Sequence, residues 1–283
     1  MIRAKWLLSL TAVALLLAGG AKSAPAAERN LILATTTSTQ DSGLLDALLP
    51  VFEKESGYVV KTIAVGSGQA MAMGQKGEAD LLLVHSPDAE TKFMADGFGI
   101  ARHLVMHNDF VVLGPPEDPA GVKGEKTAAE AFKKIAASGA LFLSRGDNSG
   151  THSKEKALWK ASQLSPDGLK WYQQTGLGMG QTLSVASDKN GYTLADRGTW
   201  LALRKNLSLA VLVEGEKNLL NVYHVIGVDP ARWPRVNAEG ARAFGDFLVS
   251  SEAQAIIGIF GADKYGQPLF FPDAGKKEEE LGR

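Results

Sequence analysis

Short apolar runs alternate with stretches of helical spacing in the first part of this chain, and this alternation limits its fold more than any other feature. The pattern predicts strands over 30–33, 58–65 and 80–84, and helices over 42–55 and 69–76. Strands and helices that alternate in this way form a parallel sheet with helices on both faces. In such sheets, ligands bind beyond the carboxyl ends of the strands. The sequence therefore predicts an α/β fold with a binding site at that edge.

A second series of strands and helices follows a break in the chain at Gly114, Pro115 and Pro116. The two prolines cannot donate to a strand ladder, so they end the apolar run 110–113. We expect the chain to leave a first lobe there and to return at about Tyr223. The predicted lobes are then 27–113 plus 223–283 and 114–222. The elements expected after the break are helices over 127–138, 154–162, 166–175 and 182–190, a strand over 140–143, a helix opened by Thr193 with Asp196 in its first turn, paired strands over 207–213 and 221–227, and closing helices over 238–250 and 252–260.

Two segments rich in hydroxyl groups and glycine lie where a predicted strand turns into a predicted helix. One runs from Ala34 to Ser38 and the other from Ser144 to His152. Such a turn presents free backbone N–H groups and the positive end of a helix dipole. Two turns of this kind that faced each other would enclose an anion. The pattern favours a protein that binds small oxyanions over one that catalyses a reaction.

The first segment holds five hydroxyl residues in succession, from Thr35 to Thr39. Capping a helix needs only one hydroxyl group, so the others are available for a ligand. We expect Thr36, Thr37 and Ser38 to contact the anion. Ser67 is a further candidate because it lies between two glycines at another strand–helix turn, where the backbone can approach a ligand closely.

The second segment contains the stronger candidate, Arg145. A guanidinium group donates hydrogen bonds in a planar fork that suits oxyanions, and it keeps its charge at any ordinary pH. Ser149, Gly150 and Thr151 would add hydroxyl and N–H donors at the start of the next helix. We expect Asp147 to orient Arg145 or the loop, since a carboxylate that faced an unprotonated oxyanion would repel it.

A hydrolase that uses Ser149 and His152 is the alternative from another class of protein. The chain has no G-x-S-x-G elbow, and a serine and a histidine this close in sequence rarely form a catalytic pair. We therefore expect no catalytic residue, no resident metal and no cofactor.

Residues 1–26 have the pattern of a cleaved export signal. Arg3 and Lys5 precede the apolar run 6–17, and 24–26 form an A-x-A cleavage site. The chain contains no cysteine, which excludes disulfides and the lipid anchor of a lipoprotein. We expect a monomer that diffuses freely in a periplasm.

The charge balance excludes several classes of partner. The whole chain has a net charge of −1, and the signal segment takes three positive charges and no acidic residue with it. The mature chain is therefore more acidic still, which argues against nucleic acid or acidic membranes as partners. An anionic ligand must be held by local dipoles and an arginine.

At these same residues the chain resembles the tungstate-binding proteins of bacterial tungstate ABC importers, the TupA type. The resemblance covers nearly all of the mature chain. It rests on four segments: 33–44 (LATTTSTQDSGL), 65–70 (VGSGQA), 144–152 (SRGDNSGTH) and 192–199 (YTLADRGT). The R-x-x-x-S-G-T portion alone is less specific, because it is similar to periplasmic phosphate-binding proteins.

The resemblance implies a type II periplasmic binding protein fold. It has two α/β lobes, each a mainly parallel sheet flanked by helices, joined by crossing strands, with the oxyanion in the cleft between them. It also implies delivery of tungstate, with molybdate as a further ligand, to a membrane permease and its ATPase. The family's binding positions correspond to Thr36 or Thr37, Ser67, Arg145 and Thr151. A phosphate- or molybdate-binding protein of the same fold is the alternative within this class.

Overall fold

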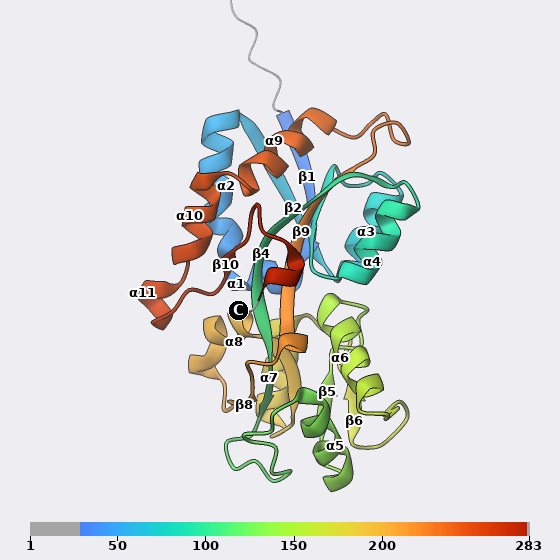
Figure 1. The fold of residues 1–283 in the computed structure, drawn as a ribbon, viewed down its shortest axis with the longest axis vertical. Coiled ribbons are helices and arrows are strands. Elements are labelled where there is room, and N and C mark those ends of the chain that lie inside the picture. The colour runs from blue at the N-terminus through green and yellow to red at the C-terminus, as the bar shows by residue number, and fades with distance from the viewer. Residues whose placement is uncertain (1–28, 282–283) are drawn as a thin grey trace, which may run out of the picture.

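The computed structural model describes residues 29–281, which form two parts stacked along the long axis of the molecule (Figure 1). The upper part contains both ends of the described chain, and the lower part contains the middle of the sequence. Two long strands run from one part to the other, β4 (Gly99–Gly114) and β9 (Leu220–Val228). The expected signal segment 1–26 lies outside the described residues.

The upper part is a mixed sheet with helices on both faces. The largest sheet has the order β10-β4-β9-β3-β1-β2, in which β1 is parallel to β2 and to β3. The parallel βαβ arrangement expected from the opening of the sequence is thereby confirmed. The remaining upper elements are β1 (Arg29–Thr36), β2 (Tyr58–Val65), β3 (Leu81–Val84), β10 (Phe271–Pro272), α1 (Thr37–Ser42), α2 (Leu44–Ser56), α3 (Ser67–Gln75), α4 (Pro87–Ala95), α9 (Ala238–Leu248), α10 (Ser251–Ile259) and α11 (Ala262–Tyr265).

The central strand β3 shows why this sheet is covered on both faces. Its four residues are apolar and fully buried. Successive side chains of a strand point to opposite faces, so Leu81 and Leu83 join one apolar cluster while Leu82 and Val84 join another. A strand that is apolar on both faces is typical of a sheet between two helical layers.

The lower part packs its helices around two smaller groups of strands. Here β7 and β8 pair antiparallel with the end of β4, while β5 and β6 pair parallel with each other. An apolar cluster that includes Phe132, Phe142 and Trp159 fills its interior. The lower elements are α5 (Ala128–Ser138), β5 (Phe142–Ser144), α6 (Gly150–Ala161), β6 (Tyr172–Gln174), α7 (Met179–Asp188), β7 (Thr193–Asp196), α8 (Arg197–Leu203) and β8 (Ala210–Val213), with short 3-10 turns at Arg204–Asn206 and Lys217–Leu219; a third lies at Glu278–Glu280 near the end of the chain.

Strand β4 changes partner where the two parts meet. It pairs with β9 as far as Asp109, opposite Leu220, and with β7 from Phe110, opposite Asp196. The boundaries expected from the sequence, 113/114 and 222/223, fall inside β4 and β9. The division of the chain into lobes 27–113 plus 223–283 and 114–222 stays a prediction.

Several expected elements differ in the structure. The helix expected over 166–175 is wrong, because 172–174 form β6 beside β5. The strands expected to pair with each other over 207–213 and 221–227 each pair with β4 instead. Helix α4, which begins at Pro87, was not expected from the sequence. The two pairings with β4 left little sign in the local sequence, because β4 lies more than 90 residues away in the chain.

The helix expected to open at Thr193 begins later. Thr193–Asp196 is β7, whose residues are all buried, and Asp196 caps α8 by accepting from the backbone N–H of Thr199 at 2.8 Å. Asp196, and not Thr193, is therefore the residue that caps this helix. Burial beside β4 overrides the local preference for a capped helix at Thr193.

Among residues 29–281, no single helix is long and apolar enough to cross a bilayer. The helices at Ala238–Leu248 and Ser251–Tyr265 reach the required length only as a pair, and that pair is bent by 55°.

Candidate functional site

Three strand–helix junctions meet where the upper and lower parts come together. They are the starts of α1, α3 and α6, each preceded by a capping residue in extended conformation. The start of α3 touches the start of α6, since the Gly68 N–H donates to the Asn148 carbonyl oxygen at 3.3 Å. The start of α1 touches the residues before α6 through a bond between Arg145 and Thr37. The two hydroxyl-rich segments of the sequence therefore lie together, as predicted.

Arg145 is the best-buried charge of this group, with 1% of its surface exposed. Its Nη2 donates to Thr37 Oγ1 at 2.9 Å and to Asp147 Oδ2 at 2.5 Å, and its Nε donates to the Leu177 carbonyl oxygen at 3.4 Å. Its Nη1 has no hydrogen-bond partner among the described residues. Asp147 orients the guanidinium group, as its position in the sequence led us to expect.

Two further candidates are buried without a partner. The hydroxyl groups of Ser67 and Thr151 are almost fully buried, and neither has a hydrogen-bond partner within residues 29–281. Burying such a group unpaired costs about 1–3 kcal/mol. Together with Arg145 Nη1 they offer three buried donors on segments that touch one another. This arrangement suits a ligand that is rich in acceptor oxygen atoms.

The threonine segment is arranged differently. Thr37 contacts Arg145, but Thr36 and Ser38 turn toward each other, with their hydroxyl oxygens 3.0 Å apart. Thr36 Oγ1 also lies 2.8 Å from Thr39 Oγ1 and accepts from the Thr39 N–H. All of these residues except Thr37 are fully buried. Thr36 and Ser38 thus lie at the junction, within a cluster of hydroxyl groups.

Ser149 and Gly150 begin α6. The Ser149 hydroxyl accepts from the His152 N–H at 3.1 Å and caps the helix. Gly150 lies so close to His85 that a Cβ there would come within 2.8 Å of its ring. The His152 ring is engaged elsewhere, because its Nδ1 accepts from the Asn148 N–H at 3.1 Å. Ser149 and His152 therefore do not form the hydroxyl–imidazole contact that a hydrolase needs.

Sequence reasoning missed two residues of this region, His85 and Asp41. His85 directly follows β3, so its position at the carboxyl end of a central strand was a usable signal. Its Nε2 lies 3.2 Å from Thr36 Oγ1 and 3.3 Å from Ser38 Oγ. Burial is the main cause that lowers the pKa of His85 to about 4, so its ring is neutral near pH 7.

Asp41 joins the two parts near the same junctions. Its Oδ2 accepts from the Gly180 N–H at 3.3 Å, at the start of α7. A carboxylate is stabilised at a helix N-terminus, where backbone N–H groups are unpaired. Burial is nevertheless the largest influence, and it raises the pKa of Asp41.

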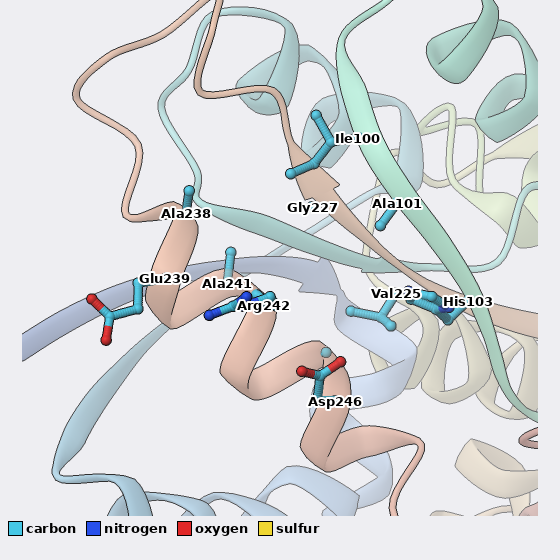
Figure 2. Close-up of a pocket in the computed structure, with 11 residues that line it drawn as sticks. Ile100, Ala101, His103, Val225, Gly227, Ala238, Glu239, Ala241, Arg242 and Asp246 are labelled. Carbon is cyan, nitrogen blue, oxygen red and sulfur yellow. The ribbon is translucent and has the colours of Figure 1, made fainter.

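A separate hollow lies in the upper part between α9 and the strands β4 and β9 (Figure 2). Its volume is about 500 Å³, and two carboxylates, Glu239 and Asp246, line it together with Arg242 and His103. None of its lining residues has a buried unpartnered polar side-chain atom. It holds no buried donor that lacks a partner, and its two carboxylates make it suit an anion poorly. Within the described residues, no three His, Asp or Glu side chains are grouped so that they could hold a metal ion.

The chain is similar in sequence and in structure to several known proteins. A PBP superfamily domain matches residues 21–252. The tungstate-binding protein TupA of Peptoclostridium acidaminophilum is 50% identical over 252 residues, which cover 88% of each chain. The solved tungstate-binding protein TupA of Desulfovibrio alaskensis G20 is 48% identical, covers 87% of this chain and 99% of its own, and has a TM-score of 0.72. The structure described as the tungstate ABC transporter from Geobacter sulfurreducens is 46% identical, covers 82% and 98%, and has a TM-score of 0.75.

Proposed function

The chain belongs to the PBP superfamily and, within it, to the tungstate-binding TupA proteins, and we propose that it captures tungstate and delivers it to an ABC importer. Tungstate is a dianion with four acceptor oxygen atoms and no proton near neutral pH. A site for it must supply donors and must not present acceptors. The protein acts by binding, and this function needs no catalytic residue or cofactor.

The observation that carries the proposal is the buried guanidinium group of Arg145 with its unpartnered Nη1. A charge buried this deeply is stable only when its donors are paired. Asp147 and Thr37 accept hydrogen bonds from Nη2, and we propose that the oxyanion accepts from Nη1. Charge-assisted bonds of this kind are among the strongest that a protein forms with an anion.

Donors from the helix starts complete the proposed site. Ser67 begins α3 and Thr151 lies in the first turn of α6, and the hydroxyl group of each is buried and unpartnered. First-turn N–H groups of both helices and their dipoles favour negative charge at the same place. We propose Thr36, Thr37, Ser38, Ser149 and Gly150 as the remaining residues that surround the oxyanion.

Ligand binding at this site would be coupled to the arrangement of the two parts of the molecule. Ser67 belongs to the upper part, and Arg145 and Thr151 belong to the lower part. An anion that bonds to donors from both parts is held more tightly when they are close together, so it favours the closed arrangement. The strands β4 and β9 connect the parts and are the natural hinge.

Proteins of this kind are extracytoplasmic components of ABC transporters, and an ABC permease is the partner that the family implies. We propose that residues 1–26 direct export to the periplasm, that the protein is not a lipoprotein because it has no cysteine, and that it works as a monomer.

Isothermal titration calorimetry on the chain without residues 1–26 tests the proposal. We expect submicromolar binding of tungstate, with molybdate as the nearest competitor and with sulfate and phosphate much weaker. Submicromolar binding of phosphate alone would overturn the choice of ligand, and the absence of binding by all four oxyanions would overturn the proposed function.

A further inference from the structure

His85 contacts the hydroxyl cluster (Thr36, Ser38 and Thr39), the start of α6 and the strand β9. Only 3% of its surface is exposed. Its ring stacks on Tyr223 of β9, with centroids 4.6 Å apart, and a Cβ added at Gly150 would come within 2.8 Å of the ring. Its two nitrogens face different groups: Nδ1 lies 2.7 Å from Asn221 Oδ1, and Nε2 faces Thr36 and Ser38.

The neighbours of Asn221 determine which nitrogen of His85 carries the proton. Asn221 Nδ2 donates to Asn108 Oδ1 at 2.8 Å and to Tyr223 Oη at 3.0 Å, so Asn221 Oδ1 remains as an acceptor. His85 Nδ1 must therefore be the protonated nitrogen that donates to it. In the neutral ring, Nε2 is then unprotonated and accepts from a hydroxyl group of Thr36 or Ser38.

This acceptor completes the pairing of the hydroxyl cluster. Thr36, Ser38 and Thr39 together carry three hydroxyl protons. The contacts of Thr36 with Ser38 and with Thr39 take up two of them, at 3.0 and 2.8 Å. His85 Nε2 accepts the third. Among the three hydroxyl groups themselves, no acceptor is left for that proton.

The same ring connects the cluster to the two strands that join the parts of the molecule. Asn221 of β9 and Asn108 of β4 are paired in register, one residue pair before β4 changes partner. Asn108 Nδ2 reaches Asp196 Oδ1 at 3.5 Å, at the cap of α8 in the lower part. A buried chain of hydrogen bonds thus runs from the hydroxyl cluster through His85 to the crossing strands.

We propose that His85 is a positioning residue of the oxyanion site. Its neutral imidazole, held in one tautomer by Asn221, accepts a hydroxyl proton from Thr36 or Ser38, orients the cluster at the start of α1 and ties it to β4 and β9. The proposal rests on the proposed function, since the consequence we assign to this orientation is tighter oxyanion binding.

Two substitutions separate the roles of the two ring nitrogens. His85→Gln can place an amide oxygen near the position of Nε2 and keeps the acceptor for the hydroxyl groups. His85→Asn can place an amide N–H near the position of Nδ1 and keeps only the donor to Asn221. Each removes one buried contact, so a purely structural role for His85 would make the two variants alike.

We expect His85→Asn to weaken tungstate binding about tenfold, as measured by calorimetry, and His85→Gln to weaken it less than about threefold. Equal affinities for the two variants, whether or not they match the wild type, would overturn the proposal. A wild-type protein that bound no tungstate would instead refute the proposed function, so the two failures are distinguishable.

A measurement on the wild-type protein needs no variant to fold. Nitrogen-15 NMR of the imidazole near pH 7 distinguishes a protonated from an unprotonated ring nitrogen. We expect His85 Nδ1 to be protonated and Nε2 unprotonated, with or without tungstate. A protonated Nε2 would contradict the proposal, because that nitrogen could no longer accept from Thr36 or Ser38.

Discussion

The two hydroxyl-rich segments of the candidate site look alike in sequence and differ in their hydrogen bonding. In the segment at the start of α1, the hydroxyl groups of Thr36, Ser38 and Thr39 are all paired, with one another or with His85. In the segment before and within α6, Arg145 Nη1 and Thr151 Oγ1 are buried with no partner among the described residues. Ser67, at the start of α3, shares this second condition.

A segment rich in hydroxyl groups is therefore not always rich in free donors. A hydroxyl proton already held by a neighbour must be released before it can bind a ligand, and that release offsets part of the gain. We therefore expect Arg145, Ser67 and Thr151 to supply most of the binding energy. The threonine segment would chiefly set the shape of the site.

Arg145→Gln is the change with the largest expected effect. It removes the charge and the donor Nη1, so we expect tungstate affinity to fall about 100-fold or more. Arg242→Gln is the matched control, because Arg242 is exposed and lines the separate hollow at α9 (Figure 2). Calorimetry on both variants checks this, and an unchanged affinity for Arg145→Gln would remove this residue from the site.

Two buried groups next to these segments, Glu155 and His85, should affect the pH dependence of stability in opposite senses. Burial raises the pKa of Glu155 in α6 to about 7, although Tyr172 and Trp159 donate to its carboxylate. The folded protein then holds this proton more tightly than the unfolded chain does. The contribution of Glu155 to stability is thus present below about pH 4.5 and is lost as the pH rises through about 7.

Glu155→Gln should remove that loss, which amounts to about 3 kcal/mol at most. Urea unfolding at pH 5 and at pH 8 gives the free energy of unfolding at each pH. We expect the difference between the two values to be smaller in the variant than in the wild type. His85 should behave in the opposite sense, because its pKa is lowered to about 4 and its contribution is lost only as the pH falls from about 6.5 through 4. An identical pH dependence in the variant and the wild type would contradict the assignment for Glu155.

Paired substitutions of threonine by valine compare the two segments directly. Thr151→Val removes an unpartnered hydroxyl group, so we expect about tenfold weaker tungstate binding with little change in the stability of the ligand-free protein. Thr39→Val removes a partnered one, so we expect a loss of about 1 kcal/mol in stability and less than about threefold in affinity. Thermal unfolding and calorimetry measure the two quantities. The reverse pattern would show that the threonine segment supplies the donors.

The smallest effect is expected at Asp41, which joins the upper part to the start of α7. Asp41→Ala removes this contact without touching the proposed ligand residues. The contact is partly exposed, and we expect tungstate affinity to fall only about two- to threefold, through a less favoured closed arrangement. Asp46→Ala, on the exposed face of α2, is the control in the same titration. A loss as large as that of Arg145→Gln would mean that Asp41 has a direct role in binding.

Local sequence patterns predicted much of this fold. Strand–helix junctions at Thr36, Gly66 and Ser149 were visible because capping residues and apolar runs are close in sequence. By contrast, Thr193–Asp196 was expected to be helical and is a strand, because it pairs with residues of β4 that lie 80 to 86 positions away in the chain. Long-range pairing of this kind leaves little trace in a single sequence.

The candidate site was predictable to the same extent. Arg145, Ser67 and Thr151 stand in motifs, and the structure brings their segments together. No motif indicated whether each donor already has a hydrogen-bond partner in the folded protein. Whether Thr36 and Ser38 are free depends on His85, which depends in turn on Asn221 of a strand 136 residues further along the chain. Their roles as ligand residues stay predictions.

A crystal grown with tungstate and measured at a tungsten absorption edge shows where the oxyanion binds. We predict one anomalous peak at the junction of α3 and α6, within hydrogen-bond distance of Arg145 Nη1, Ser67 Oγ and Thr151 Oγ1. A peak in the hollow at α9, or tungstate bound without contact to Arg145, would contradict the account.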